Sequence, residues 1–291
     1  MKKIVYLSLF LIIVIFFLSF TIEGKSDEEV FLKQNFTLEE QNYIEENNID
    51  LDILKKYFSY KNFNIYNFFE YEKIRSSSNN FLEAVNLITY PEFYHSYVNT
   101  KPALNQNTKT IIVNKHFYLS ESYIPNNLIS VSCYDVDYIK RENENMKLNQ
   151  EALEKYYEMS QEAKQMGINL TIFSSYRSYE KQKYLYYVVN KENDNYSARP
   201  GYSEHQTGLV VDISTRNIGL IEDFKYSKEY QWLKENAYKF GFIERYPENK
   251  EMYTLYSYEP WHYRYVGKET STYITNNNLT LEEYIIKNYE L

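Results

Sequence analysis

Two of the four histidines in the chain lie close to carboxylates. His205 precedes Asp212 by seven positions, and His262 follows Glu259 by three. On one straight strand, the odd offset between His205 and Asp212 would send their side chains to opposite faces. A turn expected at Thr207–Gly208 removes that constraint, because an imidazole on a loop can then meet a carboxylate on the following strand. These residue types at this spacing predict a metal site.

The chemistry that this group favours is that of a catalytic zinc ion. Zinc binds neutral imidazoles and carboxylates, and a catalytic site takes three protein ligands while one position stays open. We therefore expect His205, Asp212 and His262 to bind the metal. Pro260 disfavours helical backbone at Glu259, so we expect Glu259 on a loop beside the metal, where it can accept a proton from water. Each residue alone is more often structural, and the prediction depends on their pairing.

Short strands among helices must position these residues. Asp212 and His262 fall in β-branched or aromatic runs that are typical of strands. Polar capping residues and glycines indicate where helices begin and end. The mixture has no regular βαβ alternation, which favours an α+β fold. The predicted strands are 170–173, 209–213, 242–244 and 262–266, and the predicted helices of this part are 149–166, 178–189, 227–240 and one that begins at Thr280.

The N-terminal segment predicts where the protein acts. Lys2 and Lys3 precede a run from Ile4 to Ile22 that only Ser8, Ser19 and Thr21 interrupt. That length approaches the thickness of a bilayer core of about 30 Å. Basic residues before the run and acidic residues after it place the rest of the chain outside the cytoplasm. We expect a single-pass anchor in the cell membrane over residues 1–24, and the alternative is a cleaved signal with a secreted protein.

Between this anchor and the metal-site residues, the sequence is polar and helical in pattern. The capping box Thr37–Glu40 starts one helix. No chemistry gathers over residues 25–107, which we interpret as a helical stalk or spacer, with a wall-binding module as the alternative. Residues 108–267 are predicted to form the catalytic domain and 268–291 a helical C-terminal extension.

Composition excludes several classes of protein. The net charge is −8 and no cluster of Lys and Arg occurs, so we expect no nucleic-acid partner. The single cysteine excludes an internal disulfide and a cysteine-rich metal cluster. Composition does not predict the oligomeric state.

Ordered motifs give the chain a resemblance to a known family. The pattern Ser203-x-His205-x-x-Gly208-x-x-x-Asp212, followed by Glu259-Pro-Trp-His262, resembles the VanY-type D-alanyl-D-alanine carboxypeptidases of the LAS metallopeptidase group. The match extends from about Thr108 to Gly267. It also includes Val113–Lys115, Ser174–Arg177 with Gln182, and Gly241–Pro247.

The resemblance implies a fold and a set of roles. The fold is a small antiparallel sheet flanked by helices. The family binds zinc through the positions of His205, Asp212 and His262, and it uses the position of Glu259 as general base. The position of Arg177 polarises the scissile carbonyl, while Gln182 and Ser203 match residues that position the peptide. Val210 departs from the alanine that is usual two residues before the aspartate, without removing a ligand.

The expected reaction is removal of the C-terminal D-alanine from peptidoglycan stem peptides that end in D-Ala-D-Ala. An L,D-carboxypeptidase or a peptidoglycan endopeptidase of the same group would keep the same metal site. A dipeptidase that acts on free D-Ala-D-Ala is disfavoured by the predicted export. The alternative from a different class is a catalytically inactive wall-binding protein, which the intact ligand set and Glu259 disfavour.

Overall fold

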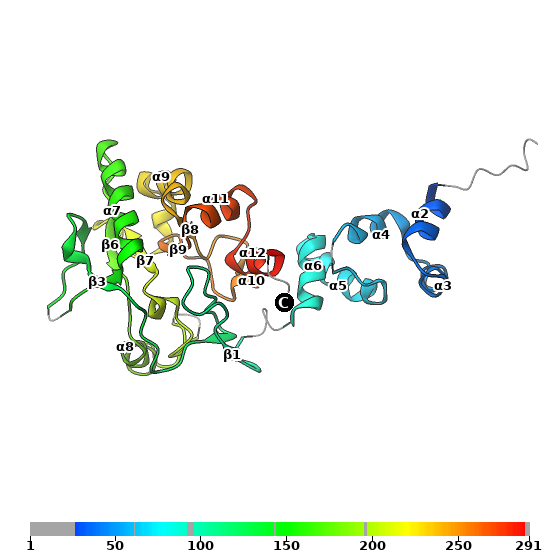
Figure 1. Ribbon diagram of the computed structural model, residues 1–291, viewed down its shortest axis with the longest axis horizontal. Coiled ribbons are helices and arrows are strands. Elements are labelled where there is room, and N and C mark those ends of the chain that lie inside the picture. The colour runs from blue at the N-terminus through cyan, green and yellow to red at the C-terminus, as the bar shows by residue number, and fades with distance from the viewer. Residues whose placement is uncertain (1–26, 61, 92–95, 143, 195–196, 289–291) are drawn as a thin grey trace, which may run out of the picture. The chain divides into compact units, whose positions relative to one another are not determined.

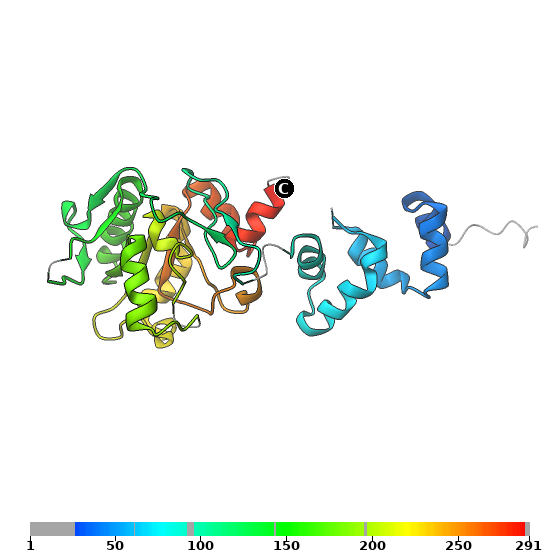
Figure 2. The ribbon, with the colours of Figure 1, turned by 90° about the horizontal axis from the view of Figure 1, so that it is seen from below.

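The computed structural model describes residues 27–60, 62–91, 96–142, 144–194 and 197–288. The chain divides into two compact units, residues 1–90 and 91–291. The first is drawn in blue to cyan and the second in the remaining colours up to red (Figures 1 and 2). Part of the predicted stalk, residues 91–107, thus belongs to the second unit. The predicted domain boundaries at 24, 107 and 267 otherwise stay predictions.

The described part of the first unit consists of helices around an aromatic core. Leu54, Tyr57 and Tyr71 are fully buried in that core. The capping box predicted at Thr37 is confirmed, because the Thr37 hydroxyl accepts from the Glu40 amide while the Glu40 carboxylate accepts from the Thr37 amide. The helices are α2 (Asp27–Asn35), α3 (Leu38–Glu46), α4 (Leu51–Phe58), α5 (Phe68–Ser78) and α6 (Phe81–Thr89), with the short η1 (Ile65–Asn67).

The predicted membrane anchor over residues 1–24 lies outside the described residues. In the part of the chain that the structure describes, no helix is long and apolar enough to cross a bilayer. A spanning helix needs about 20 apolar residues in one continuous segment, whereas the longest described helix has 16 residues. The described residues therefore do not support the location predicted from the sequence, which was a single-pass protein with the membrane as partner.

A five-stranded sheet forms the centre of the second unit. Its order is β4 (Asp137–Tyr138), β6 (Thr171–Ser174), β7 (Val210–Ser214), β9 (His262–Tyr265) and β8 (Phe242–Glu244). The fold is α+β as predicted, but the sheet is not wholly antiparallel, because β4 pairs with β6 in parallel. A parallel pair needs a long crossover, and the helix α7 (Gln150–Gln165) lies in the connection between these two strands.

The second unit also contains two small two-stranded sheets. The strands β1 (Lys101–Pro102) and β2 (Phe117–Tyr118) pair in parallel, and β3 (Leu128–Ser130) and β5 (Lys147–Asn149) pair antiparallel. Both therefore lie in the segment that precedes α7.

Capping residues start the helices of the second unit where the sequence predicts. Asn149, Ser178 and Ser227 each accept a backbone N–H from the first turn of α7, α8 (Tyr179–Tyr184) and α9 (Lys228–Asn236). The predicted helix 178–189 continues past α8 as one π-helical segment, η4 (Leu185–Val189). The remaining helical elements are η3 (Val131–Cys133), η5 (Glu204–Thr207), η6 (Glu222–Tyr226), η7 (Ala237–Phe240), α10 (Glu251–Thr254), α11 (Lys268–Asn276) and α12 (Leu281–Asn288).

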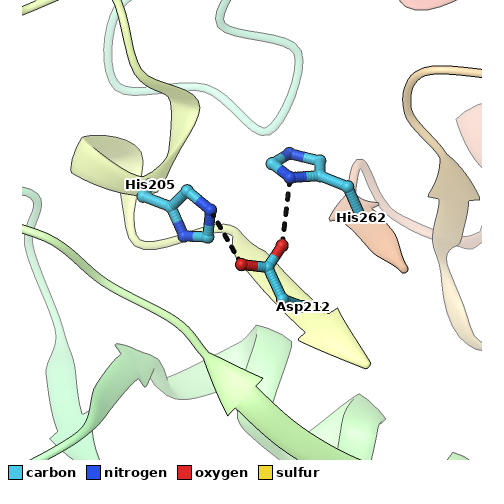
Figure 3. A group of neighbouring side chains, drawn as sticks. All are labelled: His205, Asp212 and His262. Atoms are coloured by element: carbon cyan, nitrogen blue, oxygen red, sulfur yellow. Dashed lines mark ion pairs between the residues drawn. The ribbon is translucent and has the colours of Figure 1, made fainter. Parts of the chain in front are cut away.

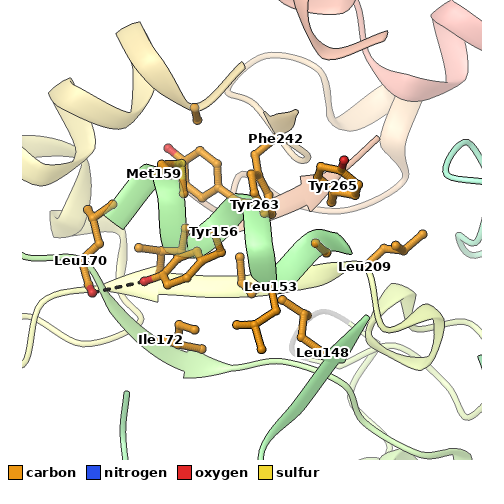
Figure 4. Packing of buried hydrophobic residues seen from close by; sticks show 14 of the residues in the cluster. Leu148, Leu153, Tyr156, Met159, Leu170, Ile172, Leu209, Phe242, Tyr263 and Tyr265 are labelled. Atoms are coloured by element: carbon orange, nitrogen blue, oxygen red, sulfur yellow. Dashed lines mark hydrogen bonds between the residues drawn. The ribbon is translucent and has the colours of Figure 1, made fainter. Parts of the chain in front are cut away.

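Strand alternation gives the sheet two different faces. Val211 and Ile213 of β7 and Tyr263 and Tyr265 of β9 belong to the apolar core, together with Leu153, Tyr156 and Met159 of α7 (Figure 4). Successive side chains of a strand point to opposite faces. The neighbours Asp212, His262 and Arg264 alternate with these core positions and therefore point to the other face, and all three are polar.

Candidate metal centre

Three side chains that could bind a metal ion converge on the polar face of the sheet. Asp212 on β7 stands directly opposite His262 on β9 in the antiparallel register. The Asp212 carboxylate lies between two imidazoles: Oδ1 is 3.1 Å from His262 Nδ1 and Oδ2 is 3.3 Å from His205 Nε2 (Figure 3). One ligand atom from each residue lies within 4.8 Å of the others, and all three side chains are buried. The structure therefore brings together the three residues that the sequence singled out.

A tight turn carries His205 to this point. The η5 turn ends at Gly208, whose φ of +69° is a left-handed conformation that favours glycine. A Cβ at Gly208 would stand 2.7 Å from Leu128 Cδ2, so no larger residue fits without a shift. His205 Nδ1 lies 2.6 Å from the Ser175 carbonyl oxygen. A proton on Nδ1 then satisfies that carbonyl, and Nε2 is left to face Asp212 and a metal.

The electrostatics of the three residues favour a cation. Burial alone would raise the pKa of Asp212, but His205 and His262 hold it well below its usual range. Burial and the positive charge of Arg177 lower the pKa of His205. Burial also acts to lower the pKa of His262, but the nearby carboxylates of Asp212, Glu204 and Glu259 outweigh it and raise the value to about 9. A carboxylate that stays ionised between two imidazoles suits a divalent metal.

Glu259 stands beside this group on the loop that the sequence predicts. The His262 amide donates to the Glu259 carbonyl at 3.1 Å, which closes a turn directly before β9. The Glu259 carboxylate points at His262, with 3.4 Å between Oε2 and Nδ1, and the side chain is 29% exposed. Burial raises the pKa of Glu259 to about 7, against the lowering effect of His262. The carboxyl group can therefore both accept and donate a proton near neutral pH.

Arg177 lies next to the same group and is held by Gln182. Its Nη1 donates to Gln182 Oε1 at 2.7 Å, and the Arg177 amide donates to the His205 carbonyl at 3.1 Å. Burial lowers the pKa of Arg177, while the charges of Asp212 and Glu259 act to raise it. Gln182 is itself anchored, because Nε2 donates to the Ser197 hydroxyl and to the Ala198 carbonyl. Gln182 thus orients the guanidinium group.

Ser203 occupies a less direct position. It is 6% exposed and directly precedes η5, but its hydroxyl does not cap that turn. Ser203 lies two residues before His205 and is separated from it by Glu204.

Sequence reasoning missed several residues around this centre. The Tyr246 ring packs against the His262 ring, with 4.6 Å between centroids and 34° between the ring planes. The carboxylate of Glu204 approaches the far side of the same ring, with 3.8 Å between Oε2 and His262 Nε2. Burial alone would raise the pKa of Glu204, but Arg245 and Arg264 outweigh it and hold the value at about 2. Two features of the sequence could have indicated these residues. Glu204 lies between Ser203 and His205, and Arg245 lies within the motif 241–247.

A cavity of about 770 Å³ opens onto the centre. Asp212 and Arg177 form part of its wall. With Arg141, Lys147 and Lys181 the wall holds four cationic side chains, against three carboxylates, Asp212, Glu142 and Glu144. The balance of charge along the wall favours a ligand that carries a carboxylate.

Comparisons with known proteins agree with this geometry. The family model VanY, described as D-alanyl-D-alanine carboxypeptidase, matches residues 145–268. YodJ of Bacillus subtilis (strain 168), whose carboxypeptidase name is provisional, is 42% identical over 62% of this chain and 69% of its own length. A D-alanyl-D-alanine carboxypeptidase of Enterococcus faecium is 32% identical over 60% of this chain and 56% of its own length.

A solved structure also resembles the chain. The LdcB LD-carboxypeptidase superposes with a TM-score of 0.60 and 38% identity, covering 67% of this chain and 95% of LdcB. The relatives thus include carboxypeptidases of both D,D and L,D type.

Proposed function

The chain belongs to the VanY family of D-alanyl-D-alanine carboxypeptidases, and we propose that it removes the C-terminal D-alanine from peptidoglycan stem peptides by zinc-dependent hydrolysis. The observation that carries the proposal is the convergence of His205, Asp212 and His262 with Glu259 beside them. Such a set of groups supports hydrolysis of a peptide bond rather than binding alone.

The residues present fit a zinc ion. Two imidazoles and one carboxylate form a common ligand set for catalytic zinc. The buried Oδ1 of Asp212 has no hydrogen-bond partner within the described residues, which suits an atom that binds a metal. We propose His205 Nε2, Asp212 and His262 Nδ1 as the ligands. When bound there, zinc would supply Lewis-acid chemistry, since it lowers the pKa of water and polarises a carbonyl.

Glu259 is proposed as the group that moves the proton. Hydrolysis forms a C–O bond from water and breaks the C–N bond of the terminal amide. The Glu259 carboxylate would take a proton from the attacking water and give it to the amine of the departing D-alanine. A pKa of about 7 supports both steps, because neither protonation state is strongly favoured near neutral pH.

Arg177 is proposed to stabilise the negative charge that develops on the carbonyl oxygen. A fixed cation in a site that excludes water acts without reorganising during the reaction. The hydrogen bond from Arg177 to Gln182 at 2.7 Å supports such a fixed position. We propose that Gln182 acts through Arg177. For Ser203 the proposed role is to support the peptide-binding wall beside η5.

The cavity next to the metal centre supports a peptide with a free C-terminus. Arg141, Lys147 and Lys181 line it together with Arg177. A terminal carboxylate can pair with such a cation through charge-assisted hydrogen bonds.

A substrate panel tests the proposal. The full-length protein would be stripped of metal by a chelator, reloaded with zinc, and incubated with muropeptides that carry pentapeptide stems, with products identified by mass. We expect loss of one D-alanine with zinc and none after stripping. Zinc-loaded protein that releases no D-alanine from any stem peptide would exclude the carboxypeptidase function.

The likeness to LdcB favours an L,D-carboxypeptidase as the second candidate. The same experiment distinguishes the two when tetrapeptide stems are included. A D,D-enzyme converts pentapeptide to tetrapeptide and stops, whereas an L,D-enzyme shortens tetrapeptide to tripeptide.

A further inference from the structure

A cluster of four charged side chains lies buried behind the metal centre. Glu204 Oε1 accepts from Arg245 Nε at 2.9 Å and from Arg264 Nη1 at 2.7 Å. Arg245 then donates through Nη1 and Nη2 to both oxygens of Glu282, at 2.8 and 2.6 Å. The exposed fraction of each of these side chains is at most 1%. Two carboxylates balance two guanidinium groups, so the cluster itself is neutral.

Nearly every polar atom of this cluster has a partner. Arg264 Nη2 donates to the carbonyls of Lys109 and Ile111, and Arg264 Nε donates to the Tyr265 carbonyl. Glu282 Oε1 also accepts from Asn114 Nδ2 at 3.1 Å. The exception is Glu204 Oε2, which finds no hydrogen-bond partner within the described residues.

That free oxygen faces a second unpaired atom. His262 Nε2 likewise lacks a hydrogen-bond partner in the described chain, and it lies 3.8 Å from Glu204 Oε2. Burying two complementary polar groups face to face without a bond is unfavourable. If either side chain moved by less than 1 Å, His262 Nε2 and Glu204 Oε2 would come within the distance of a normal N–H···O hydrogen bond. The other ring nitrogen, Nδ1, faces Asp212 and Glu259.

We propose that Glu204 is a positioning residue for the metal site, and that the C-terminal helix α12 takes part through Glu282. Glu204 would accept the Nε2 proton of His262 and so orient the ring with Nδ1 toward the metal. Arg245 and Arg264 hold the Glu204 carboxylate, and Glu282 of α12 holds Arg245. This inference rests on the proposed zinc-dependent function. It adds a role for four residues that touch neither the ligand cavity nor a reacting atom.

Strand geometry supports this arrangement. Arg245 directly follows β8, and its amide donates to the His262 carbonyl at 3.0 Å, so the two residues lie side by side. Arg264 lies two positions after His262 on the same strand and therefore on the same face. A carboxylate on the outer nitrogen of a histidine ligand fixes both its tautomer and its ring orientation.

The alternative is that the cluster only anchors α12 to the sheet. In that case its loss would lower stability without changing the ring of His262. Two measurements separate these roles: the affinity of the protein for zinc alone, from competition with a chelator, and the ¹⁵N–¹H resonance of His262 Nε2 in metal-free protein. Four histidines in the chain make this resonance assignable.

The first variant is Glu204→Gln, which keeps the shape of the side chain but removes its charge. We expect the dissociation constant for zinc to rise about 10- to 100-fold. The Nε2 proton of metal-free protein should move upfield, because a charge-assisted hydrogen bond becomes a neutral one. Folded Glu204→Gln protein with the zinc affinity and the resonance of the wild type would overturn the proposal.

A second pair of variants covers the case that Glu204→Gln does not fold. Glu282→Gln weakens the hold on Arg245 and leaves Glu204 in place. Its matched control is Glu283→Gln, the neighbouring buried carboxylate of α12, which binds Lys250 and the Thr280 amide instead. We expect Glu282→Gln to weaken zinc binding and to shift the His262 resonance, while Glu283→Gln does neither. Equal effects of the two variants would overturn the proposal.

The resonance also separates this inference from the proposed function. Wild-type protein that binds no zinc would refute the metal-dependent function, yet the metal-free spectra would still report on the Glu204–His262 contact.

Discussion

The two faces of the central sheet use the same strands for opposite purposes. On one face, Val211 and Tyr263 pack against α7 in the apolar core. On the other, their immediate neighbours Asp212 and His262 bring charge and unpaired polar atoms into a buried site. A change of one position along the strand separates the two environments.

This contrast indicates which face of the sheet stabilises the fold and which face carries the chemistry. The apolar face gains free energy from burial in proportion to the area that it removes from water. The polar face is unfavourable to bury unless each group is paired. We therefore expect substitutions at the metal centre of the polar face to change chemistry more than stability, and substitutions on the apolar face to do the reverse.

The largest effect is expected beside the polar face, at the proposed proton carrier Glu259 on the loop before β9. Glu259→Gln removes the carboxylate that can accept a proton, and kcat/KM for a stem peptide should fall by about 10²- to 10⁴-fold. The thermal midpoint should stay near that of the wild type, because Glu259 is partly exposed. The control is Glu251→Gln, an exposed carboxylate of α10. Equal activity of these two variants would contradict the assigned role.

The second prediction concerns the apolar face. Leu153 is fully buried on α7 (Figure 4). Leu153→Ala should lower the free energy of unfolding by about 2–5 kcal/mol through lost burial and a residual cavity, measured by denaturant titration. Zinc affinity of the folded fraction should be unchanged. If Leu153→Ala kept normal stability but bound zinc more weakly, the assignment of stability to the apolar face and chemistry to the polar face would be wrong.

The third prediction concerns a polar atom on the apolar face. The Tyr156 hydroxyl donates to the Leu170 carbonyl at 3.1 Å within the core. Tyr156→Phe keeps the ring and loses the bond, so stability should fall by about 0.5–1.5 kcal/mol. Chemical denaturation of both proteins would measure the difference. A loss as large as that of Leu153→Ala would mean that buried polar pairing matters as much as packing on this face.

Local signals explain what the sequence predicted well. Polar caps at Asn149, Ser178 and Ser227 act on backbone groups a few positions away, and each starts a helix in the structure. The convergence of His205 with Asp212 followed from the turn before Gly208, which is also local.

Features that depend on distant residues could not be predicted in the same way. The parallel pairing of β4 with β6 involves an edge strand of two residues, too short to show any periodicity. The ion pairs of Glu204 with Arg245 and Arg264 join residues 41 and 60 positions apart and leave no local pattern. The apolar run 4–22 suggested a membrane location that the described helices do not support.

The smallest effect is expected on the outer side of α7. Lys155 pairs with Glu158 at 2.7 Å, and both side chains are well exposed, at 39% and 51%. A pair one helical turn apart at the surface contributes only about 0.2–0.5 kcal/mol. Lys155→Ala should therefore change the unfolding free energy by no more than that, which makes it the matched control for Leu153→Ala on the same helix. If both variants lost several kcal/mol, the fragile element would be α7 itself, and burial on the apolar face would not explain the effect of Leu153.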